Sequence, residues 1–369
     1  MEPAPAVQTS RPSLAETERL AVLRVLGTGY LGMGPEVRAF ESELEAYFGP
    51  GRGVACTNTG TSALQLGVAA LGLEAGAEVL VPTFTFVASF QAIAAAGAIP
   101  VACEVLAASG LIDLQDARRR LTPRTRAIMP VHYASHPGDV AALEAFAREH
   151  RLRVVEDAAH AFGTRTAAGL VGAYGDVACF SFDPIKNITA GLGGAVVSAD
   201  PEVIAAVRRM RALGMERTTG ADGAPDMEVS GPGWRYEMSD LMAALGRAQL
   251  ARFESELKPH RIALAAEYRA RLAGCPHLTL MESEPGVVPH IFVVRIEAPR
   301  RAAARAALRA AGFETLVHYK PAHLLAAFRA GPFPVAERLY AEVLSLPMHG
   351  GVTREDVRRI AEVLGAALA

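Results

Sequence analysis

The sequence has few cysteines and almost no net charge, and both scarcities exclude classes of protein. The four cysteines are far apart and form no C-x-x-C pair, so we predict reduced core residues of a cytoplasmic protein: Cys56, Cys103, Cys179 and Cys275. A net charge of -2 provides no general attraction to nucleic acid or to an anionic membrane, so any recognition of phosphate must be local. With 51% hydrophobic and 21% charged residues, the chain is neither disordered nor fibrous.

Signals for export or membrane insertion are also missing. Residues 1–11 lack a charged segment followed by an apolar core, so we expect no secretory signal. The uncharged stretch 79–103 is long enough to span a bilayer, but it contains Pro82, Gly97 and Pro100. With its flanks it divides into a strand at 78–81, a helix at about 85–96 and a strand at 99–104. We therefore predict a buried β-α-β unit there and no membrane contact.

Strands and helices alternate through the first two thirds of the chain. This pattern predicts an α/β fold whose mainly parallel sheet is covered by helices on both faces. Around residues 229–233 the alternation stops. We predict a large α/β domain over residues 1–250, including N-terminal helices, and a smaller α+β domain over 251–369. The smaller domain contains a strand-like segment at 315–319.

One lysine lies in the loop between two predicted strands of this pattern. Lys186 follows a short apolar strand that ends before Pro184, and it precedes a glycine run that leads into another strand. Such a lysine is expected to lie in a site. In a mostly apolar pocket its amine binds a proton less tightly and can form a Schiff base with an aldehyde. The alternative is an ordinary loop lysine whose ammonium lies in water.

Two further groups are predicted near the carboxyl ends of parallel strands, where open α/β sheets bind ligands. Gly60-Thr61-Ser62 forms a turn into a helix N-terminus, which suits a phosphate; the alternative is a common helix cap. Asp157 ends a buried strand, and a pyridinium nitrogen would be a suitable partner for its carboxylate; the alternative is again a helix cap. Together with Lys186, these groups predict a site for pyridoxal phosphate.

Two pairs of histidines invite a comparison with metal sites. His132 and His136 lie on a predicted loop, and His318 and His323 flank Pro321 in a similar way. No carboxylate or cysteine near them in the sequence completes either set, so we predict no metal ion.

Several motifs resemble the DegT family of sugar aminotransferases, which have fold type I. They are Glu156-Asp157-Ala158-Ala159-His160, Ser181-Phe182-x-Pro-x-Lys186 and the segment from Gly231 to Gly246. The resemblance extends from Gly29 to Met348, nearly the whole chain.

The resemblance implies a role for each matching residue. Lys186 would carry the cofactor and shuttle the proton, and Asp157 would pair with the ring nitrogen. The phosphate would be bound by Gly60, Thr61, Ser62 and Ser181, and Phe86 would stack on the ring, although core packing remains an alternative for Phe86. His160 would lie beside the cofactor. His318, Tyr319 and His323 would lie near the substrate.

The chain also departs from the family pattern. Asp183 and Leu192 replace a frequent histidine and glutamate, which we interpret as variation in the pocket wall. The family uses the segment around Arg235 to contact the cofactor of a neighbouring subunit, which implies a homodimer with shared active sites. Glu237 stands where many members have arginine, so a surface arginine is the alternative for Arg235.

The combined hypothesis is a pyridoxal-phosphate aminotransferase that acts on a nucleotide-linked keto sugar with glutamate as amino donor. Two alternatives remain. A sugar dehydratase of the same fold is disfavoured because that branch replaces the lysine by histidine, and this chain has Lys186. A non-catalytic regulator that binds the cofactor or a sugar nucleotide is disfavoured by the presence of Lys186, Asp157 and Ser181.

Overall fold

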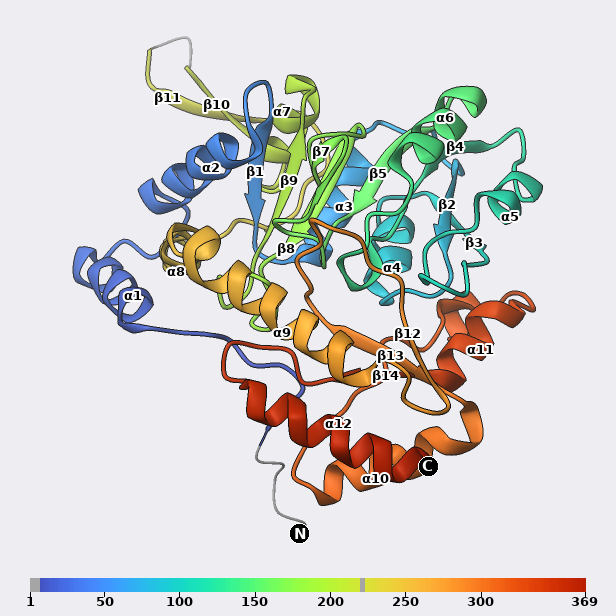
Figure 1. The fold of residues 1–369 in the computed structure, drawn as a ribbon. Coiled ribbons are helices and arrows are strands. Elements are labelled where there is room, and N and C mark those ends of the chain that lie inside the picture. The colour runs from blue at the N-terminus through green and yellow to red at the C-terminus, as the bar shows by residue number, and fades with distance from the viewer. Residues whose placement is uncertain (1–6, 220–222) are drawn as a thin grey trace.

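The computed structural model describes residues 7–219 and 223–369, and within them the largest sheet has seven strands in the order β1-β9-β8-β5-β4-β2-β3 (Figure 1). Its strands are β1 (Gly53–Thr57), β2 (Glu78–Pro82), β3 (Ile99–Cys103), β4 (Thr125–Ile128), β5 (Arg153–Asp157), β8 (Val177–Ser181) and β9 (Gly194–Ser198). The pairs β2–β3, β2–β4, β4–β5 and β5–β8 are parallel. The predicted α/β class, with a mainly parallel sheet, is confirmed.

One strand runs against the others. β9 is antiparallel to both of its neighbours, β8 and β1. The connection from β8 to β9 covers residues 182–193 and contains no helix. A parallel return normally needs a helical crossover, whereas this loop only reverses the chain. The loop carries Lys186, so the reversal places that residue at the end of the sheet where β8 stops.

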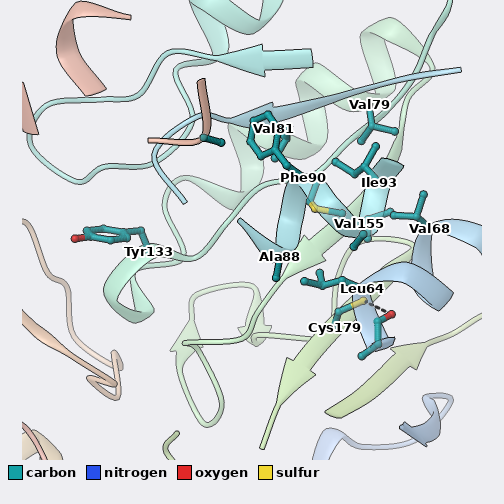
Figure 2. Close-up of a cluster of buried hydrophobic side chains, with 14 of the residues drawn as sticks. Leu64, Val68, Val79, Val81, Ala88, Phe90, Ile93, Tyr133, Val155 and Cys179 are labelled. Carbon is teal, nitrogen blue, oxygen red and sulfur yellow. Dashed lines mark hydrogen bonds between the residues drawn. The ribbon is translucent and has the colours of Figure 1, made fainter. Parts of the chain in front are cut away.

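Helices cover both faces of this sheet. One face packs against α3 (Gly60–Ala70), α4 (Ala88–Ala95) and α7 (Pro201–Met210), and the other packs against α2 (Pro35–Phe48), α5 (Leu114–Arg119), α6 (Val140–His150) and α8 (Asp240–Ala251). In Figure 2, Leu64 and Val68 of α3 and Ile93 of α4 lie against β-branched strand residues such as Val79 and Val155. Burial on both faces explains why these strands consist largely of apolar residues.

The second half of the chain forms a three-stranded antiparallel sheet from β12 (Leu278–Leu280), β13 (Phe292–Ile296) and β14 (Val343–Leu346). Its helices are α9 (Lys258–Leu272), α10 (Ala298–Ala310), α11 (Pro334–Glu342) and α12 (Arg354–Leu368), with α10 and α12 lying together below the sheet in Figure 1. The predicted boundary at residue 250 falls in the last turn of α8. One hydrophobic cluster contains both Val79 of the large sheet and Val293 of the small sheet, so the two sheets share part of their core. The division into two domains therefore stays a prediction.

Some predicted elements differ in extent. α4 begins at Ala88, about one turn after its predicted start, because residues 83–87 form a loop that reaches the site described below. The strand-like segment at 315–319 is not a strand; its only ladder contact among the described residues is an isolated bridge between Leu316 and Ser345. Three smaller features complete the fold: α1 (Glu16–Thr28), the hairpin β10 (Met215–Thr219) with β11 (Pro225–Val229), and the short pair β6 (Arg165–Thr166) with β7 (Gly169–Leu170). Across the described ranges, no helix is long and apolar enough to cross a membrane.

One buried carboxylate joins two helices near the N-terminal part of the chain. Asp240, the first residue of α8, is 2% exposed. Its Oδ1 accepts hydrogen bonds from the backbone N–H groups of Gly34, at 2.8 Å, and Val37, at 3.1 Å. These donors belong to the start of α2, where helical N–H groups have no partner within the helix. The contact therefore caps α2 from a distant part of the sequence.

We predict that Asp240→Ala lowers the free energy of unfolding by about 1–3 kcal/mol, because two buried N–H groups lose their acceptor. Urea denaturation at fixed protein concentration measures this loss. Asp240→Asn is the matched control, because its side-chain oxygen can accept both bonds, and it should retain most of the stability. Equal stability of the alanine variant and the parent protein would contradict the capping role.

Candidate active site

A cavity of about 470 Å³ opens beyond the carboxyl ends of β5 and β8, beside the N-terminus of α3. The place is the one expected for ligands of open α/β sheets. Nine of the site residues predicted from the sequence line it: Gly60, Thr61, Phe86, Asp157, His160, Ser181, Lys186, His318 and Tyr319. These residues come from both halves of the chain, so folding brings together groups that lie up to 259 positions apart (319 − 60).

Ser62 and His323 belong to the predicted set but do not line this cavity. The Ser62 hydroxyl donates to the Asn58 side chain, at 2.7 Å, and takes part in the capping box of α3 with Thr59. His323 is 2% exposed; its Nδ1 lies 2.7 Å from Thr83 Oγ1 and its Nε2 lies 3.3 Å from a carboxylate oxygen of Glu337. Both side chains already have partners elsewhere, so we assign neither of them a ligand.

Arg235 is also absent from the cavity of its own chain. Its side chain is 82% exposed, and its Nε lies 3.6 Å from a carboxylate oxygen of Glu237. An ion pair as exposed as this one contributes little stability. The guanidinium is therefore available for contact with a group outside this chain.

Lys186 is half-buried and lines the cavity. Desolvation by burial lowers the pKa of Lys186 to about 8, although the carboxylates of Asp157 and Asp183 oppose this change. Burial disfavours the ammonium because its hydration is lost. At pH 7 roughly a tenth of this amine is therefore unprotonated and nucleophilic, far more than for a lysine in water.

Asp157 lies at the end of β5 and is 6% exposed. Its Oδ2 accepts a hydrogen bond from Ser89, at 2.7 Å, and its Oδ1 accepts one from the backbone N–H of Ala159, at 3.2 Å. Burial raises the pKa of Asp157, while these bonds and the nearby Lys186 oppose that shift. A cation in the cavity next to Asp157 would stabilise the ionised carboxylate.

Two histidines and a tyrosine also line the cavity. His160 Nε2 lies 2.9 Å from the Tyr319 hydroxyl, and His318 Nδ1 lies 2.8 Å from the hydroxyl of Ser345. Burial, reinforced by repulsion from Lys186, holds the pKa of His160 well below its usual range and lowers the pKa of His318 to about 4. Both imidazoles are therefore neutral at pH 7 and can act as hydrogen-bonding groups.

The N-terminus of α3 forms a close-fitting turn against two strands. Thr59 caps the helix, accepting a hydrogen bond from the Ser62 backbone N–H at 3.0 Å. A Cβ atom on Gly60 would lie 2.6 Å from Ser181 Cβ, and one on Gly194 would lie 2.4 Å from the Thr59 carbonyl oxygen. Only glycine fits at either place. The turn thus brings the Ser181 and Thr61 hydroxyls close to the helix N-terminus, where an anion is favoured.

Sequence analysis missed several residues at or near the site. Ser89, which holds Asp157, is on α4 and has no sequence signal beyond its four-residue spacing from Thr85, whose hydroxyl is 2.9 Å away. His290 Nε2 lies 3.4 Å from Lys186 Nζ but is 104 residues away in the sequence. No local pattern links the two. Only the packing of β13 beside the loop after β8 brings them together.

The environment of His132 also differs from the sequence interpretation. A carboxylate does face it: Glu156 Oε2 lies 2.8 Å from His132 Nε2, and both side chains are buried. Neighbouring strand ends bring the pair together from 24 residues apart. Over residues 7–219 and 223–369, no group of three or more metal-ligating side chains occurs.

Comparisons with known proteins agree with this geometry. The model of the DegT/DnrJ/EryC1/StrS aminotransferase family matches residues 12–365. The dTDP-3-amino-3,4,6-trideoxy-alpha-D-glucose transaminase of Streptomyces venezuelae is 39% identical over 359 residues, covering 95% of this chain and 91% of that protein. The erythromycin biosynthesis sensory transduction protein EryC1 of Saccharopolyspora erythraea is 39% identical over 355 residues, 94% of each chain. The crystal structure of S. venezuelae DesV in complex with a ketimine intermediate has a TM-score of 0.88 and 37% identity, covering 97% of this chain and 98% of that one.

The lowered pKa of Lys186 leads to a direct prediction. In protein freed of pyridoxal phosphate, reductive methylation of Lys186 should increase with pH with a midpoint near 8, because only the unprotonated amine reacts. Peptide mass spectrometry measures the modification at each lysine. The other two lysines of the chain, Lys258 and Lys320, serve as internal references. A midpoint above 10 for Lys186 would show that its amine is hydrated and would contradict the buried site.

Proposed function

Because the chain belongs to the DegT/DnrJ/EryC1/StrS aminotransferase family, we propose that it transfers an amino group from L-glutamate to a keto sugar carried on a nucleotide. The observation that carries the proposal is the buried Lys186 amine, which shares one cavity with Asp157 and the α3 turn. The four free cysteines suit a reducing compartment, and we place the reaction in the cytoplasm.

The residues of the cavity fit pyridoxal phosphate, the cofactor of this family. Asp157 is a buried carboxylate without a cationic hydrogen-bond partner among the described residues, which suits a protonated ring nitrogen. The α3 turn excludes any Cβ at Gly60 and leaves backbone N–H groups and hydroxyls for a phosphate. Phe86 is 54% exposed within the cavity wall, unlike the fully buried Phe84 and Phe90, and so presents its ring to a ligand.

When bound, the cofactor supplies an electron sink that lets an amino group move between carbon skeletons. The chain supplies the groups around it. Lys186 would hold the cofactor's aldehyde carbon and would move the proton between that carbon and the substrate. Asp157 would keep the ring nitrogen protonated, and Ser181 and Thr61 would hold the phosphate. His160, His318 and Tyr319 would orient the substrate as hydrogen-bonding groups.

The remaining wall suits a sugar with few hydroxyl groups. Leu64, Ile185 and Leu192 line the cavity, and Leu192 is 46% exposed. Apolar walls leave hydroxyl groups without partners and thereby favour deoxygenated positions. The S. venezuelae relative is named for a 3,4,6-trideoxy product. We therefore propose a deoxy keto sugar as the substrate class.

A panel of nucleotide-linked keto sugars, assayed with glutamate and pyridoxal phosphate, tests this function. One member should be the 3-keto precursor of dTDP-3-amino-3,4,6-trideoxyglucose. Mass spectrometry should detect an amino sugar and 2-oxoglutarate. Lys186→Ala should reduce turnover by roughly three orders of magnitude or more, because the residue combines covalent and acid–base roles. Loss of oxygen from the sugar without amination would indicate a dehydratase, and binding without conversion would indicate a regulator.

We further propose that the active form is a homodimer in which Arg235 of one subunit reaches the phosphate of the other. Among the described residues that line the cavity, Lys186 is the only lysine or arginine, so much of the anionic charge of cofactor and substrate lacks a cationic partner. Arg235 is exposed beside the hairpin β10–β11, whose Met227 and Val229 are more than half exposed. A solvated two-stranded hairpin is marginal by itself, which favours a partner surface there.

Subunit mixing provides the test. Lys186→Ala and Arg235→Ala should each be weakly active or inactive as homodimers. In mixed dimers one site contains both changes and the other contains neither, so random exchange should restore about a quarter of the parent activity. Native mass spectrometry confirms the exchange. If the mixed dimers form but remain inactive, Arg235 acts within its own subunit; full activity of the Arg235→Ala homodimer would show that it has no role.

A further inference from the structure

The buried imidazole next to Lys186 has no assigned role. His290 lies just before β13 and is 1% exposed. Its backbone N–H donates to Ser135 Oγ at 2.9 Å, and its ring centroid lies 4.5 Å from that of His160. Its Nε2 lies 3.4 Å from Lys186 Nζ, within hydrogen-bonding distance. The second half of the chain therefore supplies a group that contacts the amine directly.

A buried arginine holds this arrangement in place. Arg261 on α9 is 6% exposed, and its Nη1 donates to the carbonyl oxygens of Pro289 and His290, both at 3.2 Å. Its Nη2 donates to the Lys186 carbonyl oxygen at 3.3 Å. One rigid guanidinium thus links the backbone of Lys186 to the backbone of His290. This link holds the two backbone segments from which both side chains extend.

The charge state of His290 determines the direction of the contact. Burial, and then repulsion from Lys186, His160, Arg261 and His318, holds the pKa of His290 well below its usual range, so the ring is neutral. An ammonium has only donors, so Nε2 must be the acceptor when Lys186 is protonated. The ring proton is then on Nδ1, which is buried and has no partner within the described residues.

We propose that His290 is a positioning residue that accepts a hydrogen bond from the ε-amine of Lys186 whenever this amine is not bonded to the cofactor. The contact itself does not depend on the proposed function. Only its role in catalysis rests on that function, because an aminotransferase frees this amine in every turnover. Without an acceptor, the released side chain has rotational freedom and access to the carboxylates of Asp157 and Asp183. His290 holds it toward the reacting carbon.

Cofactor-free protein tests the contact without any dependence on sugar turnover. The pH dependence of Lys186 methylation is compared in the parent, His290→Phe and His290→Gln proteins, with Lys258 and Lys320 as internal references. Asp157, Asp183, His160 and His318 also face the amine, and all are unchanged in the variants. Phenylalanine keeps a flat ring but removes the acceptor. The midpoint should therefore fall by about one pH unit in His290→Phe, because the ammonium loses its acceptor.

Glutamine provides the matched rescue. Its side-chain oxygen can accept the same charge-assisted bond from the ammonium and thereby preserve the pKa of Lys186. The midpoint of His290→Gln should therefore stay within a few tenths of a pH unit of the parent midpoint. An unchanged midpoint in His290→Phe would overturn the proposal. Equal shifts in both variants would also overturn it, since they would indicate packing alone. Circular dichroism checks that each variant is folded.

A measurement on the parent protein avoids the question of folding altogether. In ¹⁵N-histidine-labelled, cofactor-free protein at pH 7, below the Lys186 midpoint, the His290 signal should show an unprotonated Nε2 and a protonated Nδ1. The opposite tautomer would overturn the proposal. Neither this result nor the methylation profile depends on which substrate the enzyme aminates, so a failed substrate panel and a failed contact remain distinguishable.

Discussion

Burial of one amine is the constraint on which the rest of this site depends. Lys186 needs to be unprotonated often enough to react, and removal of its hydration achieves this. An amine buried without partners would be costly, so the surroundings must compensate without restoring water. Carboxylates from Asp157 and Asp183 favour the charged form, while the adjacent imidazoles stay neutral. Burial and the two carboxylates act in opposite directions, so the pKa of Lys186 lies between that of a lysine in water and that of a lysine buried without charged partners.

This balance requires both halves of the chain. The large sheet provides Asp157 and Lys186 at the ends of β5 and β8, whereas His290, His318 and Tyr319 come from the segment that contains the small sheet. Arg261 joins the two parts through backbone carbonyls on each side. Relative movement of the halves would change the distance between His290 and Lys186. The interface between them therefore forms part of the cavity as well as part of the core.

Local sequence patterns were informative where a physical signal lies within a few residues. Apolar strands, a proline, and a glycine run around Lys186 indicated a buried loop, and the end of a strand at Asp157 indicated a carboxylate at the sheet edge. Local patterns could not distinguish two roles of a residue when both roles produce the same pattern. The Ser62 hydroxyl fits a cap or a phosphate equally well by sequence, and its contacts to Asn58 and Thr59 favour the cap. The direction of β9 depended on a loop too irregular to be assigned from periodicity.

By itself, the sequence determined the fold class, the family resemblance, and the lysine, aspartate and helix turn around which a cofactor would bind. The fold class follows from short-range periodicity and turn residues, whereas the family resemblance rests on motifs spread over nearly the whole chain. Only the tertiary structure decided which groups touch Lys186. It placed His290 against the amine, left Arg235 outside its own cavity and turned His323 toward Thr83 and Glu337. Such contacts join residues far apart in the chain, and they arise from the packing of whole elements, for which no local pattern exists.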